Sequence, residues 1–196
     1  MFIAGITEFF LIACVLFSAS LFPRQAGKTL QLAYVMTLGF IALSAFMGAL
    51  RFLELANTLT FHTWFTYLSR HLAMTCFVIF SLWPNLQSSR AKLLAKMLLL
   101  LSLISCMLNL NFQLTWLTDV TIFSALLFTV YQLRRNTAAM LSVVVGLVLL
   151  ASNPLWGLII DNESLRIGIN HFCLGAYFIL LGKSFSSNFA HGQMAN

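Results

Sequence analysis

Apolar residues occur along the chain in runs of about 20, and short polar stretches separate these runs. An α-helix needs a run of that length to cross a hydrocarbon core of about 30 Å. Seven such runs can be placed, at residues 1–22, 30–52, 61–83, 93–112, 114–133, 137–160 and 165–184. The pattern predicts an all-α, polytopic membrane protein. We expect a single seven-transmembrane-helix bundle over residues 1–185 and a short cytoplasmic tail over residues 186–196.

Residues that end helices stand between most of these runs. Pro23 follows the first run and Pro84 follows the third. The boundary at 112–115 has neither glycine nor proline, but a single helix through it would be about 40 residues long, so we expect a break there. Within the sixth run, Pro154 predicts a kink because proline removes a backbone donor.

Composition supports the membrane class. The chain is 60% hydrophobic and 8% charged, with a mean hydropathy of +0.92, which excludes a soluble globular protein. The four cysteines lie within apolar runs and show no CxxC spacing, so we expect buried thiols and no disulfide framework. Because the spans use most of the chain, any chemistry has to lie among the helices or in short loops.

Charged residues predict the orientation. If seven spans alternate, eight basic residues fall on one side, which the positive-inside rule assigns to the cytoplasm. They are Arg24, Lys28, Arg90, Lys92, Lys96, Arg134, Arg135 and Lys183. The N-terminus is then outside, the C-terminus is cytoplasmic, and all five acids lie on the outer side or in the outer half of a span. The net charge of +6 is therefore a topology signal, and we expect a multi-pass protein of the cell inner (plasma) membrane with lipids and no nucleic acid as partners.

Polar side chains inside the spans mark a candidate site. A charge such as that of Arg70 costs at least about 2.5–3.5 kcal/mol in the bilayer, so it should face a partner or a wet cavity. At a rise of about 1.5 Å per residue, the polar residues of the spans gather in the outer half of the membrane. The candidates are Glu8, Arg51, Tyr67, Arg70, His71, Asp119, Asn153, Asn170 and His171. They predict a polar cavity that opens in the outer leaflet. His62 is about half a turn out of phase with His71, so we expect it at the membrane interface.

Two histidines at one depth favour a shared site. We expect the helices that carry His71 and His171 to line one cavity, where Asp119 or Glu8 would complete a divalent metal site, for example for zinc. In a metal-dependent hydrolase of lipids or lipid headgroups, these four residues would be catalytic, and Arg70 would neutralise a phosphate or oxyanion. Arg51, Tyr67, Asn153 and Asn170 would contact the ligand.

The sequence leaves two non-enzymatic alternatives open. In the first, His71 and His171 are axial ligands of a haem, or the cavity binds a small ligand in a sensor. In the second, the chain is a structural subunit of a homo-oligomer or membrane complex, and a buried pair between Arg70 and Asp119 or Glu8 only fixes helix packing.

Two seven-helix families have a related plan. Microbial rhodopsins need a lysine near the middle of the last helix, where this chain has Leu174, Gly175 and Ala176, so a retinal protein is not expected. The architecture resembles that of the zinc hydrolases of the alkaline ceramidase and adiponectin-receptor type. Their last helix carries His-x-x-x-His, whereas here His171 is followed by Gly175, so one ligand of that group is missing.

Overall fold

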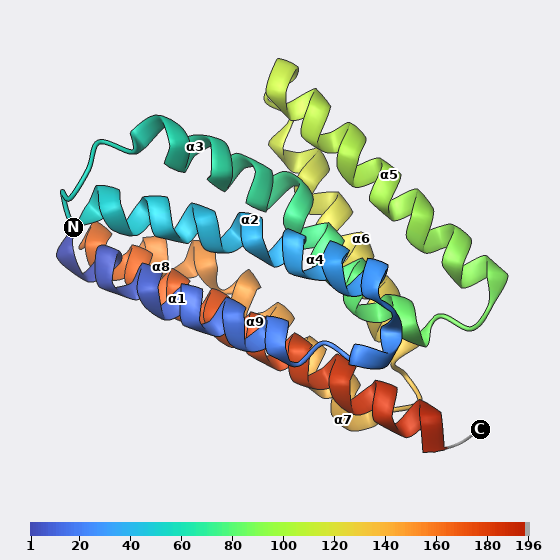
Figure 1. The fold of residues 1–196 in the computed structure, drawn as a ribbon. Helices are drawn as coiled ribbons and strands as arrows, with labels where there is room; N and C mark the ends of the chain where they lie inside the picture. Colours follow the sequence, from blue (N-terminus) through green and yellow to red (C-terminus); the bar gives the residue numbers. More distant parts are fainter. Residues whose placement is uncertain (195–196) are drawn as a thin grey trace.

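The computed structural model describes residues 1–194, except for the side chains of Thr115, Asn153, Pro154 and residues 190–194. Within this part the chain is all-helical and has no strand, which confirms the predicted fold class (Figure 1). The helices in chain order are α1 Phe2–Ser20, η1 Arg24–Ala26, α2 Lys28–Phe52, α3 Leu59–Leu68, η2 Ser69–Ala73, α4 Met74–Leu82, η3 Trp83–Asn85, α5 Ser89–Phe112, α6 Thr115–Gln132, α7 Thr137–Ala151, α8 Asn153–Ile159 and α9 Glu163–Met194.

Five helical segments among the described residues are long and apolar enough to cross a membrane. They are α1, α2, the continuous segment Leu59–Asn85, α5 and Glu163–Phe189 of α9. The other two expected spans correspond to α6, with 18 residues, and to α7 with α8. The chain is therefore a multi-pass membrane protein, while the count of seven spans and the orientation of the termini stay predictions.

Several helix boundaries follow the sequence signals. The expected break after Phe112 is present: Gln113 has a left-handed backbone with φ of 54°, and its N–H donates to the Asn109 carbonyl at 3.1 Å. The run that contains Pro154 is divided into α7 and α8. Residues 186–194, which we expected to form a tail, instead continue α9 as far as Met194.

The third run contains a feature that the sequence did not predict. Its middle, Ser69–Ala73, is a π-helical turn between α3 and α4. Such a turn inserts one residue into an α-helix and so shifts the faces on its two sides relative to each other. Within this turn Arg70 is exposed, whereas His71 is only 5% exposed.

The closest packing in the bundle is between the first and last helices, which run parallel (Figure 1). Three glycines of α9, spaced seven residues apart, face α1. A Cβ atom at Gly168 would lie 3.0 Å from Ile3, one at Gly175 2.9 Å from Cys14, and one at Gly182 2.7 Å from Ser18. Small residues at a helix interface let two backbones approach closely in a membrane. The spacing of seven therefore fixes which face of α9 meets α1.

The helix α4 lies between two groups of helices. It contacts α2 and α9 on one side and α5 and α6 on the other. Aromatic rings form part of the core here: the ring centroid of Phe77 lies 5.0 Å from that of Phe178 and 5.6 Å from that of Tyr34. The third and last predicted spans are thus neighbours at the level of Phe77.

Candidate functional site

Two separate clusters of polar side chains, each containing a buried histidine, lie among the helices. The first, which we call the Glu8 cluster, consists of Thr7, Glu8, Arg51, His62 and His171, and it joins α1, α2, α3 and α9. The second, which we call the His71 cluster, consists of His71, Ser105, Asn109 and Thr118, and it joins η2, α5 and α6. The two candidate histidines therefore belong to different clusters.

At the centre of the Glu8 cluster, a carboxyl group meets an imidazole. Glu8 is 3% exposed and His171 is 8% exposed. The Nε2 atom of His171 lies 3.4 Å from Oε1 of Glu8, and its Nδ1 atom lies 3.0 Å from Oγ1 of Thr7. Gly168 and Gly175 stand three residues before and four residues after His171, on the face of α9 that packs against α1. The close approach of these two helices holds His171 against Glu8.

One arrangement of hydrogen bonds places a single proton between Glu8 and His171. The Thr7 hydroxyl has the Ile3 and Ala4 carbonyls within reach, both at 3.0 Å; when it donates to one of them, it accepts from Nδ1–H of His171. With Nδ1 as a donor, a neutral imidazole has a lone pair at Nε2, which faces the carboxyl oxygen. A single proton between these two atoms satisfies both of them. The pair then carries no net charge, whether the proton resides on Glu8 or on His171.

A second imidazole lies on the same side of α2 as Glu8, beside Gly48. A Cβ atom at Gly48 would overlap Oε1 of Glu8 and would lie 3.1 Å from Nε2 of His62. A residue without a side chain therefore leaves room for both groups over α2. His62 is half-buried, and its expected position at the membrane interface stays a prediction.

Arg51 links the cluster to the surface. Its Nη1 atom lies 3.1 Å from Nδ1 of His62, and because an arginine can only donate, Nδ1 has to accept. The proton of neutral His62 is then on Nε2, the atom directed toward Glu8. Since the Arg51 side chain is exposed, a continuous row of polar groups leads from the α1–α9 interface to the end of α2.

The His71 cluster is centred on a single hydroxyl group. Thr118 is fully buried, and its Oγ1 atom contacts Nδ1 of His71, Nδ2 of Asn109 at 2.8 Å and Oγ of Ser105 at 2.9 Å. The Ser102 hydroxyl donates to the backbone carbonyl of His71 at 3.2 Å. These bonds join α5 and α6 to the π-helical turn. A network of this kind fixes helix packing.

Two candidates lie on the outside of the bundle. Nη2 of Arg70 donates to Oδ1 of Asp119 at 3.3 Å, so the predicted partner is present. The side chains are 56% and 60% exposed, however, so the pair does not point into a cavity inside the bundle. In the described part of the chain, no group of three His, Cys, Asp or Glu side chains is arranged to hold a metal ion.

The remaining candidates have different surroundings. The ring centroid of Tyr67 lies 4.1 Å from that of His71. The Tyr67 hydroxyl donates to the Cys106 carbonyl at 3.1 Å. Asn170 is half-buried on α9, and the side chain of Asn153 is outside the described residues.

Five buried members of the clusters were not among the candidates that the sequence predicted: Thr7, Ser102, Ser105, Asn109 and Thr118. On α5, Ser102, Ser105 and Asn109 follow a spacing of three and four residues, which places them on one face of the helix. That stripe was a signal in the sequence that the helix has a polar, buried side.

The fold and these clusters define a multi-pass α-helical membrane protein with a buried carboxyl–imidazole pair. Comparison with known proteins found no matching family model, no similar curated protein and no similar solved structure.

Proposed function

We propose that this chain is a non-enzymatic sensor of the inner membrane, in which the Glu8 cluster exchanges a proton with the outer aqueous side. One observation carries the proposal: the buried carboxyl group of Glu8 pairs with His171, and His62 and Arg51 lie beyond Gly48 in the direction of the surface. Ionisable residues inside a bundle are costly, and they commonly serve in proton or ligand pathways.

The atoms of the cluster allow a proton to move between neighbouring groups. The proton between Oε1 of Glu8 and Nε2 of His171 moves from one atom to the other without changing the charge of the pair. If that proton leaves by way of His62, the pair becomes negative in a buried position. Imidazole and carboxyl groups both accept and release protons near neutral pH in such surroundings. Arg51 keeps its charge, so it orients His62 and does not carry the proton.

The helix α3 is the element that would respond. None of the ten residues of α3 is buried, and its main helix contact is with α2. Polar contacts attach it to α2: the Thr66 hydroxyl lies 2.9 Å from that of Ser44, and His62 binds Arg51. A segment with so little buried apolar surface has a low free energy of local opening. Protonation of His62 makes its Nδ1 atom a donor, so the bond with Arg51 is lost and α3 is released from this contact.

Infrared spectroscopy of the protein in lipid bilayers tests the proposal. The C=O band of a protonated carboxylic acid should titrate with pH, and Glu8→Gln should abolish that titration. Glu163→Gln is the matched control, because this exposed acid at the start of α9 carries the same charge outside the cluster. His62→Gln should move the midpoint of the Glu8 band, since it removes the second imidazole. A band that is insensitive to pH, or that survives Glu8→Gln, would refute the proposal.

The arrangement gives less support to a lipid hydrolase. Its proposed catalytic residues lie in two clusters and on the outer surface, and those within the clusters are bonded to one another. A shared active site would have to bring His71 next to His171.

A second candidate function, a subunit of a homo-oligomer or membrane complex, is favoured by the pair of Arg70 and Asp119. Both charges are exposed, and Arg70 lies within the candidate membrane span Leu59–Asn85, where contact with lipid is costly. Two copies related by a two-fold axis would place each arginine against the partner's aspartate. Native mass spectrometry should then show a dimer that the double variant Arg70→Gln, Asp119→Asn converts to a monomer. A monomer in the unmodified protein would exclude this function.

A further inference from the structure

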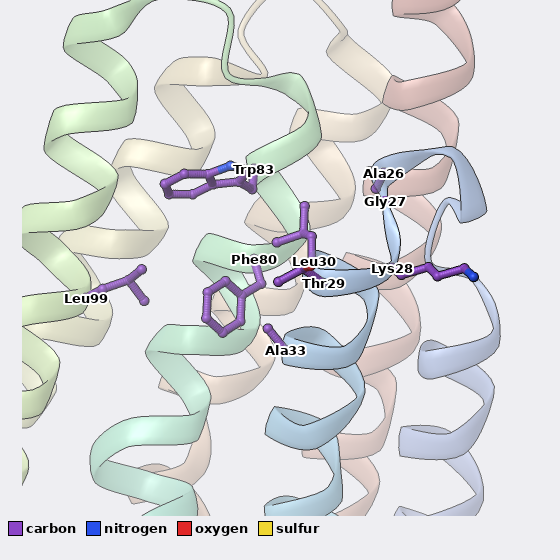
Figure 2. Close-up of a pocket in the computed structure, with 9 residues that line it drawn as sticks. All are labelled: Ala26, Gly27, Lys28, Thr29, Leu30, Ala33, Phe80, Trp83 and Leu99. Atoms are coloured by element: carbon purple, nitrogen blue, oxygen red, sulfur yellow. The ribbon is translucent and has the colours of Figure 1, made fainter.

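A groove lies at the opposite end of α2 from the Glu8 cluster. It has a volume of about 520 Å³ and is formed by the start of α2, the end of α4 with η3, and the middle of α5. Figure 2 shows the rings of Phe80 and Trp83 and the side chain of Leu99 on one side, across from the first turns of α2. The basic residues predict that this end of the bundle faces the cytoplasm.

The groove is apolar in its deeper part and lies at the level of the membrane interface. Its lining includes Leu30, Ala33, Phe80 and Leu99. Ala33 is five residues from the start of α2, so the groove reaches roughly 8 Å below that end of the helix. This is the depth at which headgroups meet acyl chains, and it is where tryptophans such as Trp83 are enriched. The dimensions and polarity match the upper part of a phospholipid.

One lysine belongs to the lining of the groove, and two more lie on the helix α5 that contributes Leu99. Lys28 belongs to its lining, and Figure 2 shows its side chain extending away from the aromatic rings. Lys96 and Lys92 precede Leu99 by three and seven residues, so they lie on the same face of α5. All three lysines are exposed, and among the described residues none of them has an acidic partner.

The acidic residues of the chain do not supply the missing counter-charge. All five lie near the other end of the bundle or in its outer half, according to the topology that the basic residues predict. These lysines therefore favour binding of a negatively charged group from outside the chain. Basic pockets at the cytoplasmic side of membrane-spanning helices bind anionic lipid headgroups for this reason.

We infer that this groove binds an anionic phospholipid of the leaflet that it faces. One acyl chain lies against Phe80 and Leu99, and the phosphate lies near Lys28 and Lys96. Trp83 packs against the glycerol region. This lipid site shares no residue with the Glu8 cluster. The inference of lipid binding is therefore independent of the proposed proton exchange.

Quenching of tryptophan fluorescence by brominated lipids tests the inference. In a variant that keeps Trp83 alone, with the other three tryptophans replaced by Phe, brominated phosphatidylglycerol in phosphatidylcholine vesicles should quench strongly at low mole fraction. The preference for phosphatidylglycerol should fall by up to about five-fold in Lys96→Gln, the effect of one lysine near a lipid headgroup. Lys183→Gln is the matched control, because it removes an exposed lysine from α9, which does not line the groove. Ala33→Phe, which fills the groove, should lower quenching by both lipids.

Two results would overturn the inference. One is equal quenching by brominated phosphatidylglycerol and brominated phosphatidylcholine, and the other is an equal effect of Lys183→Gln and Lys96→Gln. If the variant with Trp83 alone does not fold, native mass spectrometry of the otherwise unmodified protein gives the same comparison. It should then detect bound phosphatidylglycerol in preference to phosphatidylcholine, and less of it in Lys96→Gln. The absence of any such preference would likewise overturn the inference.

Discussion

The variant Gly175→Ala tests the role of the contact between α1 and α9. We expect this contact to determine both the free energy of unfolding and the geometry of the pair Glu8–His171. The added Cβ atom would lie 2.9 Å from Sγ of Cys14 and 2.9 Å from a ring carbon of Phe10. Both distances are too short for carbon contacts, so α9 or its neighbours must move. Cys14 is only 4% exposed, and the Phe10 ring packs on Phe172 with 4.5 Å between centroids. Neither side chain can move without losing contacts of its own.

The expected loss in the free energy of unfolding can be worked out by comparing Gly175→Ala with a matched variant. Gly39 is also inside a membrane-spanning helix, but no atom lies within 4 Å of the position of its added Cβ atom. Gly175→Ala and Gly39→Ala gain the same helix propensity, so this contribution cancels between them. What remains is the cost of overpacking, which is typically about 1–3 kcal/mol. We therefore expect Gly175→Ala to be less stable than Gly39→Ala by that amount.

Unfolding in mixed detergent and SDS micelles, followed by circular dichroism, measures this difference in the free energy of unfolding. Gly175 is one turn from His171, so displacement of α9 should also lengthen the contact with Glu8. The carboxylic acid band that titrates in the unmodified protein should then shift in Gly175→Ala and not in Gly39→Ala. If the two variants unfold alike, the glycine face does not hold α9 against α1, and the reasoning is wrong.

Three further predictions concern topology, the exposed ion pair and the His71 cluster. A cysteine at Asn57 should react with an impermeant thiol reagent on intact cells, and one at Ser88 should not; the reverse result would invert the predicted orientation. Arg70→Ala should cost less than the roughly 3–5 kcal/mol of a broken buried pair, because its side chain is 56% exposed; a larger loss in the same unfolding assay would contradict the exposed position. Thr118→Val should cost about 1–3 kcal/mol because it removes the hydroxyl that three polar side chains share, whereas Thr63→Val, an exposed control, should cost little; equal effects would exclude the network.

Helix positions could be predicted closely from the sequence. A membrane-spanning segment must satisfy its own backbone, so every long apolar run becomes a helix with little competition from other structures. The break near Gln113 illustrates the strength of this constraint. No glycine or proline marks it, yet the length limit alone locates it, and the structure places a left-handed residue there.

The direction of a residue around the bundle could not be predicted from its position along a helix. Similar predicted depths for His71 and His171 are necessary for a shared site but do not show that they face each other. The π-helical turn Ser69–Ala73 shifts the face of His71, and the faces on either side of such a turn cannot be read from a regular period. Arg70 shows the same limit: Asp119 was one of its two expected partners, but the exposed position of the pair was not expected.

Glycines indicate which face of a helix packs against its neighbour. Gly48 stands where Glu8 and His62 meet, and Gly175 with Gly168 presents the face of α9 that holds His171 against α1. At Gly48 the space is occupied by the carboxyl group of Glu8, whereas at Gly175 it is occupied by Cys14 and Phe10 of α1. Gly39, which has no neighbour within 4 Å of its added Cβ atom, shows that a glycine alone is not enough. The seven-residue spacing on α9, in contrast, is a periodic signal, and it favours pairing of His171 with Glu8 over pairing with His71. The two histidines lie apart because backbone approach, not the chemistry of the imidazoles, determines which helix each one meets.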